Sequence, residues 1–196
     1  MRPSSAPAVT REEAWALLTE FTKSDSLRKH ALAVEGVMRA CARRYGADAA
    51  TWGLVGLLHD FDYEMHPAAP AHPLKGAEIL RARGFPDEVV YAILSHADYS
   101  GCPRVSPLDR AIYACDELSG FVTACALVRP GRAIGGLTAA AVQKKLRDRS
   151  FARSINRDDV YRGAEELGVP LEEHVTFVID ALTGIAPSIG LGGQGG

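Results

Sequence analysis

The sequence predicts an all-α fold, in which a helical bundle is followed by a helical C-terminal extension. Nearly every periodic segment has apolar residues at helical spacing, and capping residues precede several of these segments. No segment shows the alternation that is typical of a half-buried strand. With 196 residues, of which 47% are hydrophobic and 23% charged, the chain has the size of one compact domain.

Local signals place the first helices. The helices expected in the first two thirds of the chain cover residues 10–23, 26–45, 48–60, 73–84, 86–96 and 106–128. Thr10 and Glu13 have the spacing of a capping box, which opens the first helix. Gly46 stops the second helix, and the third is an apolar run that ends in the doublet His59-Asp60.

Later boundaries are set by proline, serine and glycine. Residues 61–71 are expected to form a loop, and Pro73 occupies the first helical position after His72 as the cap. Ser106 opens a long helix that carries Asp116 in its middle. After a glycine-rich turn, further helices are expected near residues 138–149, 157–167 and 171–184.

Residues 1–189 are expected to form a single domain, because they contain no internal repeat and no linker that would divide them. Its core covers about residues 25–130, and its C-terminal helices about residues 137–185. Residues 190–196 are rich in glycine and are expected to form a flexible tail, because such a composition cannot bury a core.

Composition argues against several classes of partner. A formal net charge of −2 provides no bulk attraction to nucleic acid or to an anionic membrane. No apolar run approaches the roughly 18 residues that a membrane-spanning helix needs, and the N-terminus lacks the apolar stretch that is typical of a signal peptide. The four cysteines show no paired spacing. We therefore expect a cytoplasmic protein without membrane or nucleic-acid partners; its oligomeric state stays open.

Histidine and aspartate residues suggest a metal site. The candidate ligands are His30, His59, Asp60, His72, His96 and Asp116. Placing an imidazole and a carboxylate at the end of an apolar run is costly unless a partner such as a metal ion satisfies both. Helical bundles build metal sites from side chains of facing helices. Ordinary hydrogen-bonded polar groups are the alternative, and His66 and His174 are expected on the surface.

The chemistry of these candidates favours a divalent transition metal, bound as one or two ions. Four imidazoles and two carboxylates suit Fe, Mn, Co, Ni or Zn better than Ca, which prefers oxygen ligands alone. The absence of thiolates among the candidates argues against a structural zinc site.

The pattern resembles the HD superfamily of metal-dependent phosphohydrolases. The shared pieces are His30, the segment Leu57-Leu58-His59-Asp60, and Asp116 within residues 114–117. Residues 72–78 and 93–96 also resemble the extra-histidine branch of the family, whose members bind two metals. The similarity spans about residues 25–130, and the rest resembles the C-terminal part of small stand-alone bacterial HD proteins.

This resemblance implies an HD-domain bundle and a division of the ligands. One metal would be held by His30, His59, Asp60 and Asp116. His72 and His96 would hold a second metal, with Asp60 bridging the two. Phe61-Asp62 follows the doublet where one large branch has Ile-Gly and then Lys, so the phosphate-gripping lysine of that branch is missing. A cyclic-di-nucleotide phosphodiesterase is unsupported, because the Gly-Tyr-Pro signature is absent.

The function implied by the resemblance is hydrolysis of a small phosphorylated substrate, a nucleotide among the candidates, by a metal-activated hydroxide. Asp60 is expected to be catalytic as the shared ligand. Lys75 lies three residues after His72, which predicts the same helix face and a phosphate contact; a solvated surface lysine is the alternative. Arg104 could guard the entrance.

Several roles stay open. Asp62, Tyr63 and Tyr99 could line the pocket, whereas Glu117 is expected to point about 100° away from Asp116 around the helix. Residues 144–157 are basic and form either a solvated face or a cationic rim that attracts a polyanion. A di-iron oxygenase of the HD type and a non-catalytic module that binds a nucleotide or a metal are the alternative functions.

Overall fold

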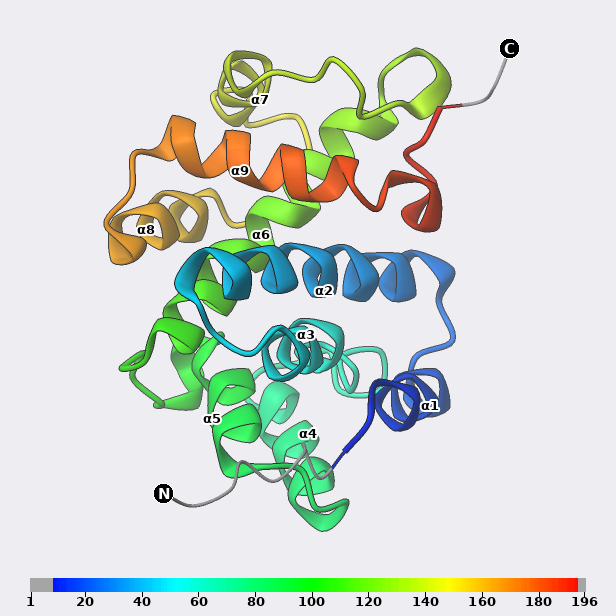
Figure 1. Ribbon diagram of the computed structural model, residues 1–196, viewed down its shortest axis with the longest axis vertical. Coiled ribbons are helices and arrows are strands. Elements are labelled where there is room, and N and C mark those ends of the chain that lie inside the picture. Colours follow the sequence, from blue (N-terminus) through cyan, green and yellow to red (C-terminus); the bar gives the residue numbers. More distant parts are fainter. Residues whose placement is uncertain (1–8, 194–196) are drawn as a thin grey trace.

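A computed structural model describes residues 9–193, and within this range the fold is all-α, which confirms the predicted class (Figure 1). The α-helices are α1 (Arg11–Phe21), α2 (Asp25–Tyr45), α3 (Ala49–Leu58), α4 (Ala71–Ala82), α5 (Asp87–Ser95), α6 (Pro107–Leu127), α7 (Ala139–Leu146), α8 (Arg157–Leu167) and α9 (Leu171–Thr183). Short 3-10 helices are η1 (Asp98–Ser100), η2 (Pro130–Arg132) and η3 (Ala186–Ile189).

Side-chain caps fix the helix ends where the sequence indicated them. Thr10 and Glu13 form the complete capping box of α1, and Ser106 forms another with Asp109 at the start of α6. Gly46 ends α2 with a φ of 63°, a left-handed conformation that glycine adopts without steric cost. These caps satisfy backbone groups that the helices leave without an internal partner.

Helix α2 crosses the middle of the molecule, with α1, α3, α4 and α5 on one side and α7, α8 and α9 on the other (Figure 1). The long helix α6 crosses α2 obliquely and contacts helices of both sides, among them α5, α8 and α9. One cluster of buried apolar side chains draws on every α-helix within residues 9–193. The elements that carry the six candidate ligands are therefore parts of one packed core.

A close approach between α2 and α3 requires a glycine. A Cβ atom on Gly56 would lie 2.8 Å from the backbone oxygen of Val34 and 2.9 Å from the Cα of Glu35. Neither backbone atom can move without displacing α2. Because α2 carries His30 and α3 ends at His59, this contact sets the distance between two of the candidate ligands.

Two expectations from the sequence are wrong: that residues 190–196 bury nothing in the core, and that His174 lies on the surface. Leu191 is fully buried, its carbonyl accepts a hydrogen bond from Ile134 N at 3.0 Å, and its own N–H donates to Ala186 O at 2.8 Å. One leucine thus anchors residues 190–193, while residues 194–196 of the expected tail lie outside the described residues. His174, expected on the surface, is buried on α9, where its Nε2–H donates to Ala114 O at 2.9 Å.

Among residues 9–193, no helix combines the length and the apolar character that crossing a membrane requires.

Replacing Gly56 with alanine is expected to lower the free energy of unfolding by about 1–3 kcal/mol, because the added methyl group overpacks the contact between α2 and α3. Urea denaturation measures the loss. Gly135→Ala is the matched control: no atom lies within 4 Å of the position its methyl group would occupy, and its φ lies outside the left-handed region, so the change should stay within about 0.5 kcal/mol. Equal stability of both variants would contradict the packing argument.

Candidate metal centre

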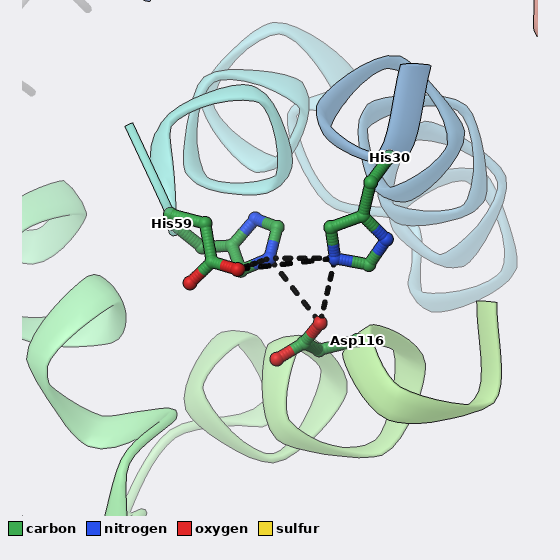
Figure 2. A group of neighbouring side chains, drawn as sticks. His30, His59 and Asp116 are labelled. Atoms are coloured by element: carbon green, nitrogen blue, oxygen red, sulfur yellow. Dashed lines mark hydrogen bonds and ion pairs between the residues drawn. The ribbon is translucent and has the colours of Figure 1, made fainter. Parts of the chain in front are cut away.

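The structure brings all six candidate ligands together. His30 lies in the second turn of α2, and His59 and His96 are the C-terminal caps of α3 and α5. Asp60 follows in the turn after α3, His72 is the second residue of α4, and Asp116 lies in the middle of α6. Figure 2 shows His30, His59 and Asp116 pointing toward one another from three helices.

The first ligand group consists of His30, His59, Asp60 and Asp116. Asp116 Oδ1 lies 3.0 Å from His30 Nε2 and 3.2 Å from His59 Nε2. The two Nε2 atoms are 3.2 Å apart, and Asp60 Oδ2 lies 3.5 Å from that of His59. Four donor atoms thus surround one small volume.

The second ligand group consists of Asp60, His72 and His96. Asp60 Oδ1 lies 3.0 Å from His72 Nε2 and 3.5 Å from His96 Nε2, and these two nitrogens are 3.3 Å apart. The Oδ2 atom of the same carboxylate faces the first group. Asp60 is therefore the residue that the two groups share.

Hydrogen bonds at the other ring nitrogen orient three of the imidazoles. His59 Nδ1 lies 2.9 Å from Gly56 O, and His96 Nδ1 bonds the carbonyl of Ile93. Because a carbonyl only accepts, each Nδ1 must carry the proton, and a neutral ring then directs the lone pair of Nε2 inward. Facing lone pairs repel each other unless a proton or a metal cation lies between them, so this donor set fits a divalent metal.

Asp62 orients the third imidazole. This fully buried carboxylate accepts a hydrogen bond from His72 Nδ1 at 2.7 Å through Oδ1 and from Gly76 N at 2.9 Å through Oδ2. Such a partner behind a ligand fixes the ring and raises its basicity. The sequence suggested Asp62 only as a pocket-lining residue, and its place two residues after the doublet was the available signal.

In the metal-free protein, neighbouring carboxylates raise the pKa of two of the imidazoles and so keep them protonated. Burial lowers the pKa of His59, but Asp60 and Asp116 outweigh it and raise this pKa to about 10. Burial also opposes protonation of His72, yet its bonds to Asp60 and Asp62 raise its pKa to about 9. Although burial raises the pKa of the Asp116 carboxyl, the neighbouring histidines outweigh burial and hold it below its ordinary value.

Lys75 is not brought to this centre. Its Nζ pairs with Glu78 Oε2 at 2.9 Å, its side chain is 54% exposed, and it does not line the cavity at the ligands. His72 and Lys75 do not share a helix face as expected, because the backbone of His72 is extended, with a φ of −79° and a ψ of 137°, and is not part of the regular helix. Helical spacing therefore does not relate His72 to Lys75.

Arg104 stabilises the scaffold beside the site. Its guanidinium donates to both carboxylate oxygens of Glu166 and to Asp98, and its Cζ lies 3.6 Å from the centroid of the Tyr113 ring. These contacts fasten the loop before α6 to α8. The side chain holds the scaffold at the edge of the site and is not free to follow a ligand.

A cavity of about 460 Å³ opens at the ligands, within the size range of small-molecule sites. We call its lining residues that belong to neither ligand group the outer wall. Tyr63 and Tyr99 line it as expected. Glu117, which was expected to point away from Asp116, lines the cavity as well, and its pKa is raised to about 8 by burial and by Asp116. A larger groove of about 730 Å³, lined in part by Tyr45 and Trp52, contains none of the six ligands.

Part of the outer wall comes from residues 154–156, which sequence reasoning did not assign to the site. Arg157 fixes this loop by donating to backbone carbonyls before it and within it, including those of Leu146, Phe151 and Ile155. Arg157, at the end of the basic segment, therefore belongs neither to a solvated face nor to a cationic rim. Only the fold shows that a residue 40 positions from Asp116 completes its pocket.

The family model of the HD domain matches residues 27–120, the span that contains all six ligands. Residues 27–120 belong to the HD domain family. The fold of the chain also resembles the crystal structure of the HD domain of the phosphodiesterase PgpH from L. monocytogenes, with a TM-score of 0.55 and 16% identity over 88% of this chain and 98% of that chain.

Two proteins named Ribonuclease Y have similar sequences. The one from Desulfotalea psychrophila is 34% identical over 93 residues, which are 47% of this chain and 18% of that protein. The one from Lawsonia intracellularis is 25% identical over 183 residues, which are 81% of this chain and 33% of that protein. This chain therefore spans a third or less of the length of these curated relatives.

Asp62→Ala is expected to weaken metal binding by roughly 10- to 100-fold, with the larger loss at the second ligand group, because His72 loses the partner that orients it. Titration with a competing chelator measures both affinities. Asp180→Ala, on an exposed part of α9, is the control and should leave them unchanged. Equal weakening of both groups, or of neither, would show that Asp62 does not act through His72.

Metal affinity is expected to rise with pH between about 6 and 9, by roughly one logarithmic unit per pH unit for each displaced proton. The metal-free protein keeps protons on His59 and His72 in this range, since their pKa values are about 10 and about 9, and a bound metal must displace them. Calorimetry in two buffers of different ionisation enthalpy counts the released protons. A pH-independent affinity would mean that neither imidazole binds metal.

Proposed function

We propose that this HD protein is a metal-dependent phosphohydrolase that cleaves a small phosphate ester. The observation that carries the proposal is the position of Asp60, whose Oδ2 faces the first ligand group and whose Oδ1 faces the second. One carboxylate can thereby hold two cations side by side. Fe, Mn, Co, Ni and Zn all suit the donor set.

The bound metals would supply a Lewis acid for a phosphate oxygen and lower the pKa of a bound water. The protein's own contribution is orientation: Gly56 O and Asp62 direct the imidazoles of His59 and His72. Buried apolar residues beneath the doublet, such as Leu58 and Phe61, exclude water from that side. A substrate enters from the cavity, where Tyr63 and Tyr99 flank the ligands.

Elemental analysis of protein purified without chelators, followed by a phosphate-release screen on the same sample, tests the proposal. The screen contains phosphate monoesters. An oligoribonucleotide is added, since two similar proteins are named Ribonuclease Y, and its cleavage is followed by strand length, because hydrolysis of a phosphodiester releases no free phosphate. Release from a monoester supports the proposal. Iron content with an oxygen-dependent spectral change and no hydrolysis would point to an HD-type oxygenase, and metal without any turnover to a binding module.

Asp60→Ala is expected to remove most bound metal and to abolish hydrolysis, because the variant lacks the shared carboxylate. His96→Ala should weaken the second metal more than the first. Metal content and phosphate release are measured on the same samples. His66→Ala is the control, because this half-buried histidine belongs to neither ligand group. Full metal content and full turnover in Asp60→Ala would refute the assignment of Asp60.

A further inference from the structure

The outer wall of the cavity carries acidic and neutral polar side chains. Among the described residues that line the cavity there is no lysine or arginine, whereas Asp98, Glu117 and Asp159 contribute carboxylates from three elements of the fold. Ser154 and Asn156 add an exposed hydroxyl and an exposed amide. Apart from bound metals, this cavity offers a ligand mainly hydrogen-bond acceptors.

The nearest guanidinium groups are already neutralised. Arg162 Nη1 donates to Asp98, and its Nη2 lies 3.5 Å from Asp159 Oδ1. Arg104 divides its hydrogen bonds between Glu166 and Asp98. Neither group is available to a second or third phosphate, so the outer wall offers a polyanion no unpaired cation.

One carboxylate keeps free acceptor capacity. Glu117 Oε2 accepts a hydrogen bond from Asn156 N at 3.2 Å, and within the described structure its Oε1 has no hydrogen-bond partner. Asp159 is more fully engaged, because it accepts from Tyr113 OH at 2.8 Å and from Asn156 Nδ2 at 2.7 Å. A hydroxyl group of a ligand could donate to Glu117 beside Asp116.

Aromatic rings border the same space. Tyr99 is 52% exposed and lines the cavity, and Tyr63 lies edge-on to the His72 ring with 5.4 Å between the centroids. An exposed ring beside acceptors offers an apolar surface for the C–H face of a sugar, while the carboxylates and amides bind its hydroxyl groups.

Building on the proposed function, we infer that the substrate carries a single phosphate group on a polyhydroxylated leaving group. The phosphate faces the metal ligands, and the hydroxyl groups face Glu117, Ser154 and Asn156. A free sugar phosphate and the ribose of a nucleoside monophosphate share this chemistry. Nucleoside diphosphates and triphosphates are poor substrates, because their further phosphates meet no unpaired cation in the outer wall.

The test measures kcat/KM of the metal-loaded protein for ribose 5-phosphate, propyl phosphate, AMP, ADP and ATP. Ribose 5-phosphate should exceed propyl phosphate by roughly tenfold or more, since a site that binds hydroxyl groups rejects an analogue without them. AMP should exceed ADP and ATP. Equal rates for ribose 5-phosphate and propyl phosphate, or ATP matching AMP, would overturn the inference. Whichever of ribose 5-phosphate and AMP is better identifies the source of the sugar.

Two variants separate charge from stacking. Ser154→Lys places a cation in the outer wall and should reduce the preference for AMP over ADP by roughly tenfold; the control, Ser188→Lys on the exposed surface of η3, should not. Tyr99→Leu should raise the KM for ribose 5-phosphate and leave the KM for propyl phosphate unchanged. The control is Tyr161→Leu, at a similarly exposed tyrosine of α8, and it should change neither KM. Unchanged preference and KM in both cavity variants would overturn the inference.

Failure of the proposed function gives a different result. In that case none of the esters, propyl phosphate included, releases phosphate, and calorimetry compares the binding of ribose 5-phosphate and propyl phosphate to the metal-loaded protein. Tighter binding of the sugar by roughly tenfold supports the recognition without the hydrolysis. Equal affinities overturn the recognition as well.

Discussion

The Asp60 carboxylate, set between two pairs of imidazoles, is the constraint on which the site depends. Its two oxygens face different ligand groups, and His59, its neighbour in the chain, is fully buried. Without a metal, the carboxylates compensate by keeping protons on His59 and His72, whose pKa values they raise, and a bound cation would replace those protons. Helix α3 ends at Leu58, and the turn that follows brings the side chains of His59 and Asp60 to the same site.

Packing around α3 fixes this geometry. Gly56 allows α2 to approach closely, and its carbonyl also bonds the His59 ring, so one residue sets both the distance between helices and the rotation of a ligand. Gly76 has a similar double role: a Cβ there would lie 2.7 Å from the Asp62 Cγ, and its N–H bonds the same carboxylate. The core and the site share these atoms, so a change in packing displaces a ligand.

Caps and helix order could be predicted from the sequence, because they depend on local chemistry. The doublet at a helix end pointed to a metal site, and the resemblance to the HD superfamily related the other candidate ligands to it. The role of Lys75 could not be predicted, because the extended His72 breaks the helical relation on which it depended. The local sequence around His174 and Leu191 gives no sign that they are buried. His174 is buried against α6 and Leu191 bonds Ile134, and only the folded chain brings these partners near. For the same reason, residues 154–156 gave no local sign that they line the cavity.

The arginine side chains around the site stabilise the fold. Arg104 joins Asp98 to Glu166, Arg162 joins Asp98 to Asp159, and Arg157 bonds the carbonyls of the loop that forms part of the outer wall. Once a metal has displaced the protons of the imidazoles, positive charge inside the cavity must therefore come from the metal itself. The same ions that would activate a phosphate ester would then also supply the field that attracts its phosphate.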